Sequence, residues 1–174
     1  VVSSASLGKS LLATMADGGF VILPPSHPVA PGRVVGILWD NNHSKYSIYS
    51  DSFGGPDGTD WTLGSFVVNG DGLKSNETNL AALPDGRIVA THRLSDSPAF
   101  DNRKYSISDD GGVTFVEQGL LPAWEGAVCS ASLAQIDKTG VTGPVGRLAM
   151  SRPVRNEFHD RAGILIDFAN DEML

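Results

Sequence analysis

The chain has 174 residues, of which 41% are hydrophobic and 19% are charged, a balance that is typical of a folded globular domain and excludes a disordered one. Its 13 basic and 20 acidic residues give a net charge of −7 with no basic tract, which argues against a nucleic-acid partner. The single cysteine excludes an internal disulfide, and the longest apolar runs are far too short for a transmembrane segment.

Metal and targeting signals are absent from the sequence. The histidines at 27, 43, 92 and 159 show no ligand spacing, so we expect no catalytic metal and no cofactor. The first residues, Val1-Val2-Ser3-Ser4, have no basic region and no initiator methionine, so no signal peptide is predicted there and the compartment is left open.

Short runs rich in β-branched and aromatic residues follow one another along the chain, separated by glycine and proline. They predict strands over 11–16, 20–23, 33–39, 46–50, 63–68, 78–83, 87–92, 104–108, 128–136, 147–151 and 163–168. Asp-Gly pairs at 17–18, 85–86 and 110–111 predict tight hairpin turns, because both residues accept a positive φ. No segment keeps the 3.6-residue apolar period of a helix. The sequence therefore predicts an antiparallel all-β fold.

An internal repeat refines this prediction. Residues 45–48 read Lys-Tyr-Ser-Ile and recur unchanged at 104–107, 59 positions later, and both copies run on into a Ser-Asp pair. A unit of this length with roughly four short strands has the size of one propeller blade.

The second copy continues into a turn motif. Residues 108–115 read Ser-Asp-Asp-Gly-Gly-Val-Thr-Phe and fit the pattern Ser-x-Asp-x-Gly-x-Thr-aromatic. In such a turn the Ser and Asp side chains bond the backbone, glycine supplies the unusual φ and the aromatic ring packs inward. The motif resembles the Asp-box, or bacterial neuraminidase repeat, of the sialidase family. A degenerate copy spans 50–61, where Ser52 replaces the expected Asp and residues 55–58 resemble an insertion.

In sialidases these boxes lie on the propeller face away from the active site. The resemblance therefore implies structural roles for Asp110, Gly112 and Phe115. Asp-boxes also occur in propellers of other functions, so the motif indicates a fold more than a reaction.

A more specific resemblance covers residues 76–93. As in sialidases, an Asn-Glu pair opens a strand, a Leu-x-Asp-Gly turn follows, and the next strand ends in Arg. The resemblance implies that Glu77 is the partner of a tyrosine nucleophile and that Arg93 is one of three arginines that hold the substrate carboxylate. Considered alone, Glu77 would be a solvated strand-end carboxylate and Arg93 a surface cation.

Residues 148–153 and 161–166 resemble the family's Ser-x-Pro loop followed by an arginine that opens a strand. This resemblance implies that Arg161 is a second member of the carboxylate clamp. Arg152 and Arg155 are alternatives, and Asp160 could pair with Arg161 and leave it structural.

Taken together, the resemblance implies one segment, residues 1–174, of a six-bladed sialidase-type β-propeller with about two to three four-stranded blades. The first clamp arginine and the acid/base aspartate would precede Val1, and the nucleophile would follow Leu174. Tyr46, Tyr49 and Tyr105 lie before or inside the repeats and are no substitutes.

The implied function is that of an exo-α-sialidase, a glycoside hydrolase that removes terminal sialic acid from glycans, glycoproteins or glycolipids. As a fragment, the isolated chain is expected to be inactive and unstable, because an open propeller leaves edge strands unpaired. The alternative is a non-catalytic Asp-box propeller that binds a glycan or a protein partner.

Overall fold

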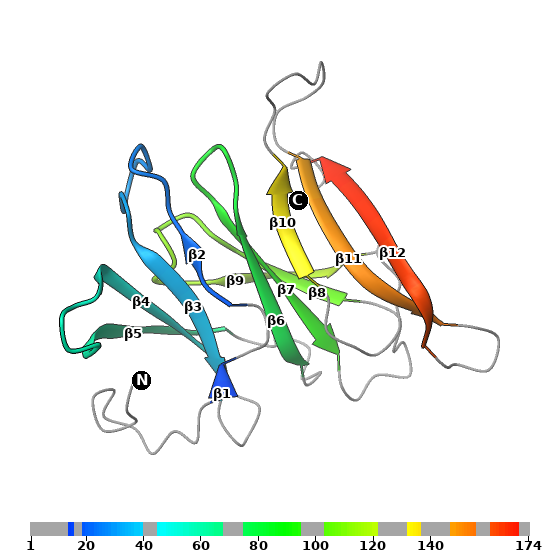
Figure 1. Cartoon of the computed structure of the whole chain (residues 1–174), viewed down its shortest axis with the longest axis horizontal. Helices are drawn as coiled ribbons and strands as arrows, with labels where there is room; N and C mark the ends of the chain where they lie inside the picture. Colours follow the sequence, from blue (N-terminus) through cyan, green and yellow to red (C-terminus); the bar gives the residue numbers. More distant parts are fainter. Residues whose placement is uncertain are drawn as a thin grey trace.

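The computed structural model describes residues 14–15, 19–39, 45–67, 75–94, 103–121, 132–136, 147–155 and 161–170. These residues form three antiparallel sheets and no helix, so no apolar helix among them is long enough to span a membrane (Figure 1). The predicted antiparallel all-β fold is confirmed.

The sheets follow one another along the chain. The first contains β1 (Thr14–Met15), β2 (Val21–Ile22), β3 (Val34–Trp39), β4 (Lys45–Gly54) and β5 (Asp60–Val67), in the order β1-β3-β4-β5 with β2 also paired to β3. The second has the order β6 (Ser75–Ala82), β7 (Ile88–Leu94), β8 (Arg103–Ser108) and β9 (Val116–Leu121). The third has the order β10 (Ser132–Ile136), β11 (Arg147–Arg155) and β12 (Arg161–Asn170).

One strand of each sheet, β2, β6 or β10, lies beside a strand of the next sheet. β6 contacts β2 on one side and β10 on the other, and the sheets fan out from these strands (Figure 1). Consecutive four-stranded meanders that place their first strands around a common axis are the blades of a propeller.

Two apolar cores join the blades, and the second sheet contributes to both. Leu80 and Ile88 belong to the core against the first sheet, whereas Ala81 and Val89 belong to the core against the third. Because side chains alternate across a strand, a sheet between two others must be apolar on both faces, and β7 accordingly begins with an unbroken buried run, Ile-Val-Ala.

The strand predictions need three corrections. β9 was not predicted: its first five residues, Val-Glu-Gln-Gly-Leu, alternate between exposed and half-buried and only Leu121 is buried, so this outer strand lacks a strong apolar signal. β4 extends through Ser52 to Gly54, into the predicted turn.

The predicted Ser-x-Pro loop is the third correction, since residues 151–153 belong to β11, where Pro153 pairs with Ile164 of β12. Within the described residues β10 follows β11 only as far as Ser151, so Pro153 is not required to donate a hydrogen bond on that side. Of the other predictions, the 17–18 turn and residues 11–13, 16, 68 and 128–131 of three predicted strands lie outside the described part of the chain.

The turn at 108–115 has the predicted hydrogen bonds. Ser108 Oγ accepts from Gly112 N at 2.9 Å, and Asp110 Oδ1 accepts from Val113 N at 3.0 Å and Thr114 N at 2.9 Å. Gly112 has a φ of 87°, and the Phe115 ring is buried in the core between the first and second sheets. These residues are therefore structural, as predicted.

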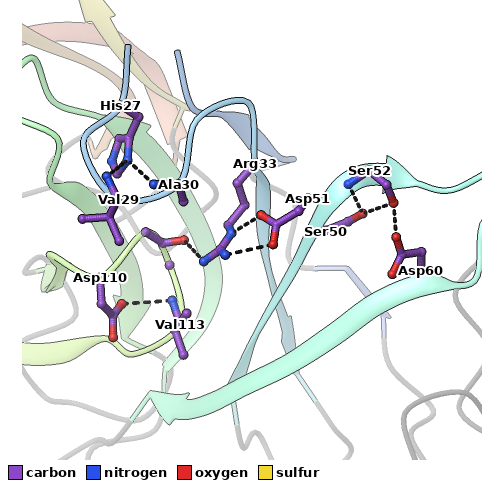
Figure 2. A network of polar contacts seen from close by, with 12 residues as sticks. His27, Val29, Ala30, Arg33, Ser50, Asp51, Ser52, Asp60, Asp110 and Val113 are labelled. Carbon is purple, nitrogen blue, oxygen red and sulfur yellow. Dashed lines mark hydrogen bonds and ion pairs between the residues drawn. The ribbon is translucent and has the colours of Figure 1, made fainter. Parts of the chain in front are cut away.

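Polar contacts tie this turn to the neighbouring sheet (Figure 2). Arg33 donates to both carboxylate oxygens of Asp51, at 2.6 and 3.0 Å, and to the Gly111 carbonyl at 3.3 Å, and its guanidinium lies 4.3 Å from the centre of the Tyr49 ring. Hydrogen bonding to Arg33 lowers the pKa of Asp51 below its ordinary value.

His27 makes a second connection between the two sheets. Its Nδ1 accepts from the backbone N–H groups of Val29 and Ala30, at 3.2 and 3.0 Å, so its Nε2 carries the proton and donates to the Gly86 carbonyl at 2.7 Å. Gly86 lies in the predicted Asp85-Gly86 turn, which is confirmed and joins β6 to β7. Both connections lie at the end of the sheets that carries the turns at 85–86 and 108–115. A site would therefore lie at the opposite ends of these strands.

Candidate functional site

Glu77 and Arg93 form an ion pair at the start of β6 and the end of β7. Arg93 Nη1 lies 2.6 Å from Glu77 Oε1 and 2.8 Å from Oε2. Their side chains are 18% and 21% exposed, so the pair is half-buried but open to solvent. The sequence anticipated both residues, and the structure brings them into contact.

A strand irregularity explains how Glu77 reaches Arg93. Ser75 pairs with Leu94 and Thr78 with His92, so two residues of β6, Asn76 and Glu77, oppose Arg93 alone. An extra residue in one strand is a β-bulge, which bends the strand and changes the direction of a side chain. Arg93 alternates with His92 and shares the face of Val89, so the ion pair faces the third sheet.

Further polar side chains line this face of the second sheet. Asn79 and Thr91 are register partners next to the ion pair, and Arg103 is the register partner of Arg93 on β8. All three are buried. Among the described residues, Arg93 Nε, Asn79 Nδ2 and Thr91 Oγ1 are buried without a hydrogen-bond partner. Unsatisfied donors beside an arginine suit a polar, anionic ligand.

The opposite face carries a buried polar cluster that sequence reasoning missed. Lys45 of β4 reaches from the first sheet to Thr78 and His92, and His92 Nε2 lies 2.9 Å from Ser106 Oγ. Lys104 lies on the same face and binds Glu117 at 2.9 Å. The repeated Lys-Tyr-Ser-Ile segment was the available signal, because both lysines open a copy of it.

Burial dominates the electrostatics of this cluster. It lowers the pKa of Lys45 well below its ordinary value, and the charges of Arg103 and Lys104 lower it further. Burial likewise lowers the pKa of His92 well below its ordinary value, and the Lys45 charge acts in the same direction. Both groups are therefore held toward their neutral forms.

The third predicted residue, Arg161, opens β12 opposite Arg155 of β11, as the sequence indicated. β12 runs upward in Figure 1 and begins at the lower side, whereas the turn between β6 and β7 is at the top. Arg161 thus begins its strand at the same end of the fold as Glu77 and Arg93. The side chains of Arg152, Arg155 and Arg161 and the whole of Asp160 lie outside the described part, so the role of Arg161 stays a prediction.

A hollow of about 380 Å³ lies between β2, β6 and β10, farther along β6 than Glu77. Leu80, Ala81 and Ala82 line it from β6. Its walls come from three successive sheets, through β2, β6 and β10, so it marks the axis around which the blades are arranged. Within the residues that the structure describes, no three His, Cys, Asp or Glu side chains gather as metal ligands.

No protein-family model and no curated protein matches the chain. Among solved structures, the Hadza microbial sialidase Hz136 is 18% identical with a TM-score of 0.61, covering 91% of this chain and 28% of that one. The K499G mutant of NanB sialidase from Streptococcus pneumoniae is 16% identical with a TM-score of 0.64, covering 92% of this chain and 22% of that one. A protein of unknown function from Dyadobacter fermentans is 19% identical with a TM-score of 0.67, covering 95% of this chain and 40% of that one.

The chain thus spans well under half of the length of each of these proteins. Sequence identities this low are evidence for a shared fold alone. With the three meanders and their shared axis, they confirm that the chain folds as part of a sialidase-type β-propeller of two to three blades.

Proposed function

We propose that residues 1–174 are the central part of the catalytic propeller of an exo-α-sialidase, which removes terminal sialic acid from glycans, glycoproteins or glycolipids. The observation that carries the proposal is the Glu77–Arg93 ion pair, at one end of a blade of the sialidase type. The turns at 50–61 and 108–115, at the opposite ends of their strands, are then the Asp-boxes of this propeller.

The chemistry of sialic acid gives each residue a task. Its anomeric carbon bears a carboxylate, so a neutral tyrosine activated by a carboxylate base approaches that carbon with less repulsion than an anionic nucleophile. Glu77 is this base, and the tyrosine is supplied by another blade of the complete propeller. Arg93 and Arg161 bind the substrate carboxylate.

The geometry of the pair is compatible with both tasks. Among the described residues Glu77 contacts the Arg93 guanidinium through Nη1 alone, so Nη2 remains as a donor for a substrate carboxylate. Arg93 also fixes the Glu77 carboxylate from one side, which orients it for proton transfer.

The same ion pair also favours a second candidate function. Glu77 and Arg93 satisfy each other's charge, which is what a purely structural pair does. In that case the chain belongs to a non-catalytic propeller that binds a glycan or a protein partner.

The experiment is hydrolysis of a fluorogenic sialoside by the protein expressed from its complete reading frame. Arg93→Ala removes charge-assisted hydrogen bonds worth about 1.5–3 kcal/mol, so KM is expected to rise between about tenfold and a hundredfold. Glu77→Gln is expected to lower kcat more than it raises KM.

Arg87→Ala is the matched control. It removes an arginine from the other end of the β6–β7 hairpin, where Arg87 pairs with Asp85 at 2.6 Å, and is expected to leave the kinetics unchanged. Near-normal hydrolysis by Arg93→Ala would refute its role. A wild-type protein that binds sialosides without cleaving them would favour the second candidate.

A further inference from the structure

Lys45 links two strands of the neighbouring blade. Its Nζ lies 2.8 Å from Thr78 Oγ1 and 3.1 Å from His92 Nδ1, and these two atoms lie 3.0 Å apart. The three side chains are at most 1% exposed. Lys45 comes from β4 of the first sheet, whereas Thr78 and His92 are register partners on β6 and β7 of the second. The contact is therefore a closed triangle that bridges two blades.

This triangle lies directly behind the Glu77–Arg93 pair. Thr78 follows Glu77 in the chain, and His92 precedes Arg93. Adjacent side chains of a strand point to opposite faces, so a contact that fixes Thr78 and His92 also fixes the backbone that carries the ion pair. No other residue is needed to transmit this restraint.

The bulge makes such a restraint necessary. The pairing of β6 with β7 is irregular between Ser75 and Thr78, and Glu77 lies within this interval. A bulge interrupts the ladder of backbone hydrogen bonds, so the ladder alone holds Glu77 loosely. Thr78–His92 is the first regular pair beyond the bulge, and Lys45 binds both of its members.

We propose that Lys45 is a positioning residue: from the adjacent blade it holds the bulged end of β6 against β7 and so sets the geometry of the Glu77–Arg93 pair. This inference rests on the proposed function for its consequence in catalysis, but not for its structural part. A site held in place by groups on a rigid neighbouring element is more precise than one held by its own strand end.

Lys104 provides a matched control. It occupies the same place in the second Lys-Tyr-Ser-Ile segment and is as fully buried as Lys45. It is the register partner of His92, so it lies on the same face of the second sheet as His92. Its Nζ binds Glu117 of β9, on the outer side of the blade. Losing either lysine removes a buried amine, but the Lys45 amine bridges Thr78 and His92 next to the ion pair, whereas the Lys104 amine binds Glu117.

The first test does not depend on activity. Lys45→Met and Lys104→Met are made in the full-length protein. In each of these backgrounds, Glu77→Gln, Arg93→Met and the two together are compared by urea unfolding. This double-mutant cycle gives the coupling between Glu77 and Arg93. The coupling between Glu77 and Arg93 can be expressed as a ratio of folding equilibrium constants. In the Lys45→Met background this ratio is expected to fall by about fivefold or more. In the Lys104→Met background it is expected to be unchanged, whatever the effect on overall stability.

The second test is kinetic. Lys45→Met is expected to lower kcat/KM for a fluorogenic sialoside about tenfold, mostly through kcat, whereas Lys104→Met retains the wild-type value. If Lys45→Met does not fold, Thr78→Val removes the bridged hydroxyl at nearly constant volume and is expected to reduce the coupling in the same way.

Undiminished Glu77–Arg93 coupling in Lys45→Met, or in Thr78→Val if that variant stands in for it, overturns the inference. An inactive wild-type protein whose coupling nevertheless depends on Lys45 refutes the proposed function and leaves the positioning role intact.

Discussion

Replacement of Arg33 by methionine tests how the first two blades are held together at their turn ends. Methionine keeps the apolar stem of the side chain but removes the two hydrogen bonds to Asp51, the one to the Gly111 carbonyl and the guanidinium over the Tyr49 ring. Asp51 belongs to β4 of the first sheet (Figure 2), whereas Gly111 lies between β8 and β9 of the second. The substitution therefore acts at the junction of the blades.

The expected cost follows from the individual contacts. Asp51 is 63% exposed, so water screens the ion pair and reduces its value to at most about 1 kcal/mol. The long hydrogen bond to Gly111 contributes about 0.5–1 kcal/mol, and the cation–π contact with Tyr49 contributes about 0.5–1 kcal/mol. Arg33→Met should therefore lower the unfolding free energy by about 2 kcal/mol.

Urea unfolding of the full-length protein at pH 7 measures this cost, with Arg87→Met as the control. Arg87 also forms an ion pair at 2.6 Å, but its partner Asp85 lies in the same turn, so its loss should cost less than about 0.5 kcal/mol. In 1 M salt the loss of unfolding free energy in Arg33→Met should become smaller only by the contribution of the Arg33–Asp51 ion pair, which salt screens. Equal effects of the two substitutions would refute the account of the junction.

Other predictions concern backbone strain and pH. Gly112→Ala should destabilise the protein by about 2–4 kcal/mol, because the new Cβ would lie 2.4 Å from Val35 Cγ1 at a φ of +87°. Gly32→Ala, at a φ of +73° with no atom within 4 Å, should cost only about 1–2 kcal/mol, and equal losses in thermal unfolding would contradict the packing at Gly112. Partial burial opposes ionisation of Asp110, but hydrogen bonds from Thr114, Ser108 and Val113 outweigh it and hold its pKa below the ordinary value. Its contribution to stability is therefore complete above about pH 4 and lost as the pH falls through the lowered pKa, so Asp110→Asn should flatten this acid limb in urea titrations from pH 2 to 6. His92 also has a lowered pKa in the folded protein, so below about pH 6.5 unfolding takes up a proton and the stability falls as the pH falls. His92→Gln should remove this pH dependence. An unchanged pH dependence would contradict the burial of a neutral imidazole.

The sequence was most informative where local rules decide the structure. The Asp85-Gly86 turn fixes the β6–β7 hairpin, and this hairpin necessarily brings Glu77 and Arg93 to the same end of adjacent strands. β9 escaped prediction because an outer strand is stabilised by pairing with β8 and not by its own apolar pattern. Pro153 suggested a loop, but the free side of β11 beyond Ser151 accepts a residue without an N–H group.

The polar cluster behind the ion pair could not be predicted from the sequence. Lys45, Thr78 and His92 are far apart in the chain, and each alone resembles an ordinary strand residue. Their contact depends on how the first sheet packs against the second, which no local pattern encodes. The same holds for Arg33, whose partners are Asp51 of β4 in the first sheet and Gly111 in the turn between β8 and β9 of the second.

The proposed function requires that Glu77 and Arg93 form part of a sialic-acid site. The most direct measurement is a crystal structure of the full-length protein with a bound sialic-acid analogue. We expect the carboxylate of the analogue to lie within hydrogen-bond distance of the Arg93 guanidinium, with Glu77 on the same side of the sugar. An analogue bound elsewhere, with the Glu77–Arg93 pair closed and untouched, would contradict it.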